Sequence, residues 1–458
     1  MLTGFRPSAD CVVADLGSYP APSAGPGPDH TSTRRFPTMA ATPHPHSPTT
    51  EAPVLLVMGS GDRRYREYIV AAVSRHFRLW LLDAHEPSWQ LPYVEGTSLL
   101  DTKNLDELLA EAKKVMQQLP VVGVFTYDES LVHAAARLAE ALGLPGSAPD
   151  AVLACRDKAT TRARLAAADV PQPACTPVAT AAEARSAADR TGYPVVIKAR
   201  GLAGSLGVVR ADDGDAVEAA FEAASSANWP GVPRYEADVL VEEYLTGPEI
   251  SIDAVVVDGV CTPMIVARKQ VGMDPYFEET GHTVDAADPL LQDPELLDQL
   301  HRIHQALGFE HGATHTEFKL TPKGPRLVEI NARLGGDFIP LIGMLATGTD
   351  PAVAAAQVAA GLTPDTAPKA RKTAAIRFLY PESDCEAVEV TVRTDLFGPT
   401  VHSAVATAGP GTTLALPPRA YMNRYGYVIA VGEDRDQVTA DADAAPTLVE
   451  LRSRPLDA

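Results

Sequence analysis

Short apolar runs alternate with amphipathic segments in the first part of the chain that carries any periodicity. The runs at 54–58, 77–83 and 121–127 are almost entirely apolar, which predicts parallel strands buried on both faces. A helix is predicted after the first run, and another at 131–143. Strands that alternate with helices indicate an α/β domain, which we assign to residues 53–149.

The pattern then changes to strands joined by turns. A helical stretch that carries Lys158 leads into an alanine-rich helix ended by "DVPQP". Strands are predicted on both sides of the glycine-rich segment 201–208, and from Glu249 onward alternating apolar and acidic residues predict a half-exposed strand. A turn at 246–248 leads into that strand, and this strand-turn-strand is expected to present Glu242 and Glu249 near each other. A turn at 321–324, "TPKG", joins two further strands. We assign residues 150–360 to a second domain.

Composition and charge narrow the classes of function. The chain has 458 residues with 39 basic and 59 acidic side chains, a formal net charge of −20, which disfavours nucleic acid and anionic membranes as partners. No apolar run reaches the roughly 18 to 20 residues of a membrane span. Residues 1–52 are rich in Pro, Ser, Thr and Gly and predict a disordered tail. Five scattered cysteines favour neither a zinc site nor disulfides, so we expect a cytoplasmic protein.

A lysine followed by a glycine-rich loop is the first candidate for chemistry. Lys198 ends an apolar strand, where a solvated lysine is unexpected, and "GLAGSLGV" follows with Gly204 and Ser205. Backbone N–H groups and a hydroxyl in such a loop suit phosphate oxygens, and the lysine supplies positive charge. An ordinary glycine-rich hairpin is the alternative. The loop lacks the G-K-[ST] of a Walker A motif, and the earlier Gly59-Ser-Gly61 turn favours a plain strand-to-helix connection over a dinucleotide site.

The stretch "LVEINARLGG" at 327–336 is the second candidate. Glu329 and Asn331 are two residues apart and share a strand face, and the preceding turn sets Glu317 across from Glu329. Three oxygen-bearing side chains of this kind suit Mg²⁺, and a cation between two carboxylates offsets their repulsion. The alternative is an exposed acidic hairpin. Arg333, on the same side, is placed to bind a transferring phosphoryl group.

In this order the motifs resemble the ATP-grasp superfamily of carboxylate–amine ligases. The resemblance rests on the two lysines, the glycine-rich loop, "VEEYLTGPE" at 241–249 and "VEINAR" at 328–333, and it covers roughly residues 150–350. It implies ATP as cofactor with Mg²⁺, for which Mn²⁺ can substitute. The residues implied to bind the nucleotide are Lys158, Lys198, Gly204, Ser205, Glu242, Tyr244, Leu245 and Glu249, and those implied to hold the metal are Glu317, Glu329 and Asn331.

The resemblance also implies what each group does. The lysines and the loop would contact phosphates, Glu242 and the backbone around Tyr244 and Leu245 would hold the adenine, and Glu249 would hold the ribose. Arg333 is the implied catalytic residue, because it would stabilise charge during phosphoryl transfer and at the acyl centre.

Residues 361–458 resemble the β-rich closing domain of bacterial L-amino acid ligases, which make dipeptides. The implied fold is α/β and α+β, an ATP-grasp fold with an N-terminal α/β domain and a β-rich C-terminal closing domain. The implied enzyme joins a small-molecule carboxylate to an amine through an acyl phosphate and releases ADP and phosphate. Arg268, Lys269 and His282 are candidate substrate contacts, and the alternative for each is a solvated surface residue. A homodimer is compatible with this assignment.

Two other functions fit the same motifs. One is another ATP-grasp reaction, such as that of a carboxylase or a nucleotide-pathway ligase, although the chain has no M-K-M biotinyl motif. The other is a non-catalytic ATP-binding regulator. The intact metal-binding set and Arg333 disfavour a regulator, because a sensor can dispense with them.

Overall fold

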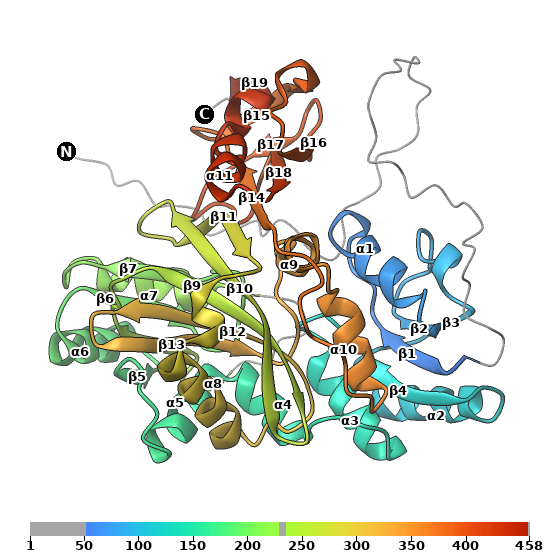
Figure 1. Ribbon diagram of the computed structural model, residues 1–458. Helices are drawn as coiled ribbons and strands as arrows, with labels where there is room; N and C mark the ends of the chain where they lie inside the picture. The colour runs from blue at the N-terminus through green and yellow to red at the C-terminus, as the bar shows by residue number, and fades with distance from the viewer. Residues whose placement is uncertain (1–51, 229–234, 457–458) are drawn as a thin grey trace.

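The computed structural model describes residues 52–228 and 235–456. The predicted tail, 1–52, lies almost entirely outside these residues. In Figure 1 the N-terminal elements form one unit at the right, the central elements a larger unit at the left, and the C-terminal strands rise above both. Within the described ranges no single helix is long and apolar enough to cross a membrane, and the one helix pair that passes this test together, α9 with α10, is bent by 106°.

The N-terminal unit is a four-stranded parallel sheet in the order β3-β2-β1-β4. Every residue of β1 is buried, as the apolar sequence VLLVM predicts for a strand covered on both faces. The sequence pattern does not predict β3, because that strand is short and none of its residues is buried. The elements are β1 (Val54–Met58), α1 (Arg63–Val73), β2 (Arg78–Asp83), a 3₁₀ turn (Leu91–Tyr93), β3 (Gly96–Leu99), α2 (Leu105–Met116), β4 (Val121–Phe125) and α3 (Val132–Leu142).

A second sheet is antiparallel, in the order β5-β8-β6-β7. Two helices, α6 and α7, pack against it largely through alanines, which let a helix approach a sheet closely. The glycine-rich loop connects β6 to β7, as predicted. The elements are α4 (Pro149–Arg156), α5 (Lys158–Ala167), β5 (Cys175–Val178), α6 (Ala181–Thr191), β6 (Val195–Ala199), β7 (Val208–Ala211), α7 (Val217–Ser226) and β8 (Val239–Glu243).

The largest sheet has eight antiparallel strands in the order β13-β12-β9-β10-β11-β14-β18-β16. Its strands come from both sides of residue 360, so one sheet crosses the predicted boundary between the second and third domains, and that boundary stays a prediction. The elements are β9 (Glu249–Val257), β10 (Val260–Gly272), β11 (Glu278–Asp285), a 3₁₀ turn (Pro289–Gln292), α8 (Pro294–Leu307), β12 (Gly312–Thr321), β13 (Gly324–Asn331), α9 (Ile339–Thr347), α10 (Pro351–Ala359), β14 (Thr373–Leu379), β16 (Val401–Ala406) and β18 (Gly426–Gly432).

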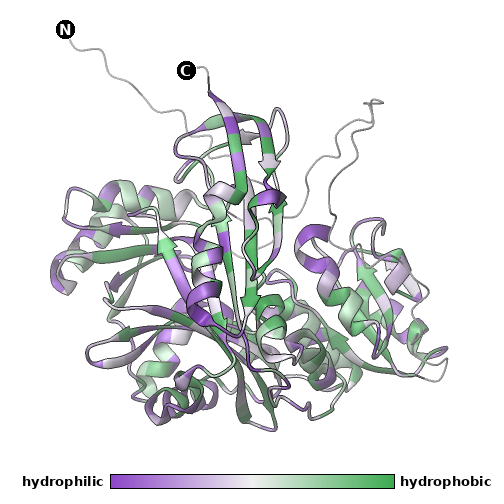
Figure 2. Cartoon of the chain, turned by 45° about the horizontal axis from the view of Figure 1, so that its top comes forward, coloured by the Kyte–Doolittle hydropathy of each residue, from purple (hydrophilic) through white to green (hydrophobic). Residues whose placement is uncertain are grey.

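β9 lies in the middle of this sheet, so the prediction of a half-exposed strand is wrong. Its polar residues Ser251 and Asp253 are fully buried, and β10 and β12 pair with the strand on both edges. Asp253 finds partners there in His315 and the N–H of Gly335. The alternation therefore marks a buried polar face. Figure 2 shows hydrophobic residues along the interior strands and hydrophilic residues on outer helices.

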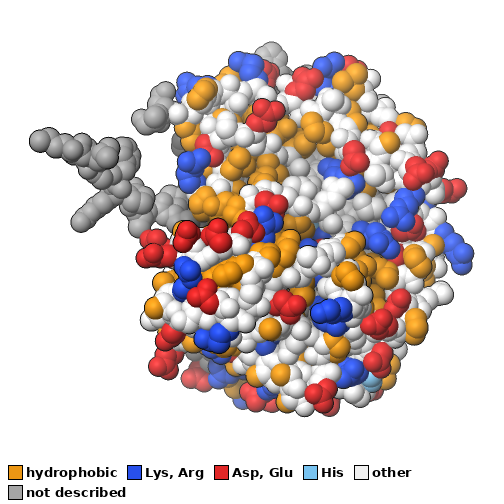
Figure 3. Space-filling model, turned by 90° about the vertical axis from the view of Figure 1, so that its left-hand side faces the viewer, with side chains coloured by type: hydrophobic (Ala, Val, Ile, Leu, Met, Phe, Trp, Pro, Cys, Tyr) orange, Lys and Arg blue, Asp and Glu red, His pale blue; other side chains and the backbone are white. Residues whose placement is uncertain are grey.

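A small sheet, β17-β15-β19, completes the C-terminal region. Its elements, with those beside it, are β15 (Cys385–Val392), a 3₁₀ turn (Thr394–Leu396), β17 (Thr413–Leu414), α11 (Arg435–Asp443), α12 (Ala445–Leu448) and β19 (Val449–Pro455). On the face shown in Figure 3, basic and acidic side chains are interspersed rather than gathered by sign. The four cysteines within the described residues are unpaired.

Candidate active site

Residues predicted to bind the nucleotide belong to a buried cluster of charged side chains. Lys198 Nζ lies 2.7 Å from Glu242 Oε2, and the adjacent strands β6 and β8 bring the two together. Arg162 of α5 donates hydrogen bonds of 2.8 and 3.2 Å to the same carboxylate. Burial alone raises the pKa of Glu242, but Arg162 and Lys198 outweigh burial and bring the pKa down to about 2. Glu242 is therefore an anion shared by two cations.

The glycine-rich loop, residues 201–207, docks against the C-terminal half of the chain. Ser205 adopts a left-handed φ of 58°, and its Oγ donates a 2.9 Å hydrogen bond to the carbonyl of Phe277. Gly204 also has a positive φ, and a Cβ there would lie 3.0 Å from Cε of Met422. The backbone is thus held in conformations that favour glycine. Its contact with phosphates stays a prediction.

Lys158 links this loop to the predicted metal-binding strand. Its Nζ lies 3.0 Å from Glu329 Oε2 and also donates to the carbonyl of Leu202 in the loop. The side chain is buried at the start of α5. A cation here contacts both the loop and the acidic hairpin, where terminal phosphates are expected.

The predicted pairing of the acidic hairpin is confirmed. Glu317 of β12 lies opposite Glu329 of β13, and Asn331 follows on the same strand. Lys269 Nζ lies 2.9 Å from Glu317 Oε1, while Glu329 pairs with the α5 lysine, so each carboxylate is neutralised by an ammonium group. Carboxylate and amide oxygens on neighbouring strands fit the ligand preference of Mg²⁺. The metal role of these three side chains stays a prediction.

Lys269 joins three acidic side chains. It is 1% exposed, and Nζ lies 2.6, 2.9 and 3.1 Å from Glu279, Glu317 and Glu249. Burial lowers its pKa, but the three carboxylates reverse the effect and raise the pKa well above the ordinary value. The surface alternative for Lys269 is therefore wrong.

His315 bridges two carboxylates beside Lys269. Its Nδ1 lies 2.6 Å from Asp253 Oδ1, and its Nε2 lies 3.2 Å from Glu317 Oε1. Burial favours the neutral ring, yet Asp253 and then Glu317 raise the pKa of His315 to about 9. The ring is therefore an imidazolium at neutral pH, and it orients Glu317.

Arg333 connects the central unit to the N-terminal unit. Its Nε donates a 2.7 Å hydrogen bond to Glu129, which lies in the segment between β4 and α3, and its Nη1 donates to the carbonyl of Leu334. Glu329 is among the charges that raise the pKa of Arg333. The guanidinium thus lies near the acidic hairpin, and its catalytic role stays a prediction.

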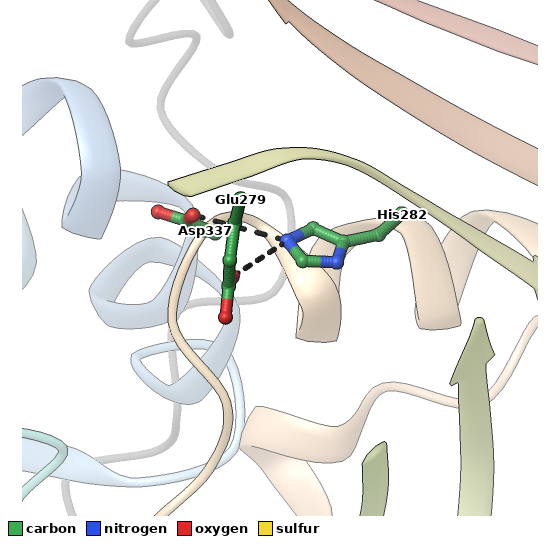
Figure 4. Close-up of side chains that lie close together, drawn as sticks. All are labelled: Glu279, His282 and Asp337. Atoms are coloured by element: carbon green, nitrogen blue, oxygen red, sulfur yellow. Dashed lines mark ion pairs between the residues drawn. The ribbon is translucent and has the colours of Figure 1, made fainter. Parts of the chain in front are cut away.

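Glu279, His282 and Asp337 form a second compact cluster, drawn in Figure 4. The fully buried His282, on β11, has Nε2 3.2 Å from a Glu279 oxygen and 3.8 Å from an Asp337 oxygen. Lys269 already pairs with Glu279, and Arg424 donates hydrogen bonds of 2.9 and 2.6 Å to Asp337. An imidazole between carboxylates that already have cationic partners suits Mg²⁺ less well than the oxygen-only set on the hairpin. The surface alternative for His282 is wrong.

Some predicted contacts take other partners. Arg268 precedes Lys269 on β10 and so points to the opposite face, where it donates hydrogen bonds of 2.7 and 3.0 Å to Asp288. The structure therefore does not bring Arg268 to the ion cluster. The Tyr244 ring lies 6.3 Å from that of Phe277, and Leu245 is partly exposed.

Glu242 and Glu249 are predicted to lie near each other on a strand-turn-strand. Their strands instead belong to two different sheets. Glu242 pairs with the cations described above, whereas Glu249 lies 3.1 Å from Lys269 and 2.9 Å from Lys319. The predicted strand-turn-strand is present, but its two carboxylates take different cations, because the chain changes sheets at the turn.

Seven residues of this charge network are not predicted from the sequence: Glu129, Arg162, Asp253, Glu279, His315, Asp337 and Arg424. Arg162 has a usable signal, since it lies four residues after Lys158 and shares its helix face. Arg424 has none, because its partner Asp337 is 87 residues away in sequence.

Comparisons with known proteins agree with this fold. Residues 191–340 match the ATP-grasp domain, and residues 81–146 match the ATP-grasp N-terminal domain. The chain contains an ATP-grasp domain. The fold of the L-amino acid ligase from Bacillus licheniformis superposes on this ATP-grasp protein with a TM-score of 0.74 at 20% identity, covering 89% of this chain and all of the other. ATP-grasp ligases use ATP with Mg²⁺ or Mn²⁺.

Several relatives have named activities. Alanine–anticapsin ligase of Bacillus subtilis is 30% identical over 260 residues, which are 52% of this ATP-grasp protein and 54% of the relative. Human carnosine synthase 1 is 29% identical over 343 residues, which are 70% of this chain and 41% of the relative. The chain thus spans about half the length, or less, of these two relatives.

Proposed function

We propose that this ATP-grasp protein is a carboxylate–amine ligase that joins amino acids or similar small molecules into an amide. The similarity to alanine–anticapsin ligase and carnosine synthase 1 supports this class of reaction. The observation that carries the proposal is the pair Glu317 and Glu329, which face each other across a hairpin with a lysine on each carboxylate. Such a pair offers hard oxygen ligands beside cations that suit phosphate.

The proposed chemistry has two steps. A substrate carboxylate oxygen attacks the γ-phosphorus of ATP, the bond to the β,γ-bridging oxygen breaks, and ADP leaves while an acyl phosphate forms. An amine then attacks the acyl carbon, loses its proton, and displaces phosphate. Both steps move negative charge between oxygens, so fixed cations in a water-poor site supply most of the stabilisation.

Each group of residues has a part in this scheme. The bound metal would neutralise charge on the phosphates. Lys198 and Lys158 would hold phosphate oxygens, and Arg333 would stabilise charge on the transferred group and at the acyl carbon. Closure of the glycine-rich loop would exclude water from the acyl phosphate. The residues proposed to hold the metal are Glu317, Glu329 and Asn331.

The amine substrate is expected at the Glu279, His282 and Asp337 cluster. Two carboxylates there favour a cationic ammonium group, and Lys269 fixes the position of Glu279. A ring nitrogen within 4 Å of both carboxylates is placed to receive the proton that the amine loses.

The products of ATP distinguish this reaction from adenylation, in which the α-phosphorus is attacked. The full-length protein is incubated with ATP, Mg²⁺ and pairs of amino acids, and products are detected by mass spectrometry. We expect ADP, phosphate and amide in equal amounts, with ¹⁸O from the labelled carboxylate appearing in the phosphate. AMP and pyrophosphate as stoichiometric products would contradict the mechanism and the roles of both lysines and Arg333.

A further inference from the structure

A buried arginine beside the active site has hydrogen-bond donors without acceptors. Arg156 is the last residue of α4 and is 7% exposed. Its Nε and Nη2 are buried and have no hydrogen-bond partner within residues 52–228 and 235–456. Glu129 Oε1 lies 3.9 Å from Nε, which is close enough for charge attraction but too far for a hydrogen bond. Burial of a guanidinium with unsatisfied donors is unfavourable, and among the described residues the attraction of Glu129 offsets only part of this cost.

The two residues that follow Arg156 are fully engaged. Asp157 accepts hydrogen bonds of 2.6 and 2.7 Å from Arg200, at the start of the glycine-rich loop. Lys158 pairs with Glu329 on β13. Three consecutive buried side chains therefore reach toward the N-terminal unit, the loop and the metal-binding hairpin. Of the three, Arg156 alone has buried side-chain nitrogen atoms without any hydrogen-bond partner among the described residues.

Glu129 connects Arg156 to the predicted catalytic residue. It accepts the 2.7 Å hydrogen bond from Arg333, so two guanidinium groups share one carboxylate. The carboxylate neutralises one positive charge of the two and leaves donors of Arg156 free. A planar guanidinium with free donors binds carboxylate and phosphoryl oxygens in preference to neutral groups.

We propose that Arg156 and Arg333 together bind an oxyanion of a substrate, with Glu129 holding both guanidiniums in place beforehand. The proposal rests on the ligase function above. The oxyanion is either the terminal phosphate of the nucleotide or the carboxylate of the acyl donor, since both present the same oxygens. Binding would give the buried donors of Arg156 their missing acceptors. Arg156 itself makes and breaks no covalent bond.

The stability of the ligand-free protein separates a binding role from a structural one. The full-length Arg156→Gln variant is compared with Arg377→Gln, since Arg377 is as buried but donates to Asp443 and to backbone carbonyls. We expect Arg156→Gln to melt at or above the wild-type temperature, because an unsatisfied buried charge is removed, and Arg377→Gln to melt below it. Melting of Arg156→Gln below wild type, as for Arg377→Gln, would overturn the proposal.

Binding measurements identify the source of the oxyanion. Calorimetry uses the Mg²⁺ complexes of ADP and of the non-hydrolysable ATP analogue AMP-PNP, and steady-state assays measure KM for the acid that supports ADP release. If the terminal phosphate is bound, Arg156→Gln weakens AMP-PNP binding about tenfold or more and leaves ADP binding unchanged. If the acyl donor is bound, both nucleotides bind as in wild type and KM for the acid rises by a similar factor.

Unchanged nucleotide binding together with an unchanged KM would overturn the proposal. The same holds if nucleotide binding is unchanged and the wild-type chain releases no ADP with any acid. A third outcome is that the wild-type protein makes no amide while the Arg156→Gln variant binds AMP-PNP more weakly than wild type. This outcome would contradict the ligase function and support the oxyanion site. The two failures are therefore distinguishable.

Discussion

At the scale of single residues, the charge of His315 links the stability of the fold to pH. The imidazolium bridges Asp253 and Glu317, and these carboxylates raise its pKa to about 9 from an ordinary 6.5. A raised pKa in the folded state contributes stability that is fully present below about pH 6.5 and is lost as pH rises through 9. His315 therefore makes the folded protein less stable on the alkaline side.

The His315→Gln variant tests this contribution. Urea unfolding of wild type between pH 6.5 and 9.5 should show a loss of about 3 kcal/mol at most from this group, and the variant should show a shallower slope. His304→Gln is the control, because burial lowers the pKa of His304 to about 4 and its titration falls on the acid side. Equal slopes for wild type and His315→Gln would show that the ring is not charged in the folded state.

At the scale of elements, the glycine-rich loop depends on Gly207. Its φ is 69°, and a Cβ there would lie 2.7 Å from the Cβ of Ala227 and 3.3 Å from that of Ala199. An alanine at this position must therefore both adopt a left-handed backbone and displace a helix end. The loop reaches its observed position only because this residue is glycine.

Gly207→Ala should reduce the affinity for Mg²⁺-bound ATP and lower the free energy of unfolding by about 1 to 2 kcal/mol. Gly259→Ala is the matched control, since Gly259 also has a positive φ but a Cβ there would meet no atom within 4 Å. Calorimetry and urea unfolding measure the two effects. Wild-type nucleotide affinity in Gly207→Ala would exclude the loop from the nucleotide site.

At the scale of the whole molecule, a buried ion pair between Arg424 and Asp337 links the C-terminal region to the segment after β13. Arg424, in the segment before β18, donates two hydrogen bonds to Asp337 and one of 2.8 Å to the hydroxyl of Tyr380, and its guanidinium lies 3.6 Å from the ring centre of Phe378. Asp337 has a left-handed φ of 49°, which this pair helps to hold. The pair fixes the segment before β18 beside the cluster of Glu279, His282 and Asp337.

Arg424→Gln should lower the free energy of unfolding by about 3 to 5 kcal/mol, because it leaves the buried Asp337 without its main partner. The double variant with Asp337→Asn should recover part of the loss, since both charges are then removed. The control is Arg452→Gln, which breaks the exposed pair with Glu389 and should change little. An unchanged free energy of unfolding in Arg424→Gln would mean that the pair does not stabilise the fold.

Four predictions about the whole molecule are not tested by the structure or by the comparisons. They concern the homodimer, the cytoplasmic location, the division into domains and the disorder of residues 1–52. The ATP-grasp fold, by contrast, is confirmed by the family match and by the similarity to a solved ligase.

The sequence by itself determined the local units of this site. The apolar run of β6 that ends at Lys198 and the hairpin that sets Glu317 opposite Glu329 follow from period, turn and burial within a few residues. The same is true of the glycine-rich loop. These patterns depend only on residues close together in the sequence, so a single segment is enough to predict them.

Only the tertiary structure decided which charges meet. Lys269 and Arg268 are neighbours on one strand, and nothing local says which of them faces the acids and which faces Asp288. Arg333 and Glu129 are 204 residues apart, and they meet because α10 packs against β4 of one sheet and against β9 and β12 of another. The physical reason is that strand alternation fixes opposite faces, whereas the packing of sheets decides which face is inside and which partner lies across it.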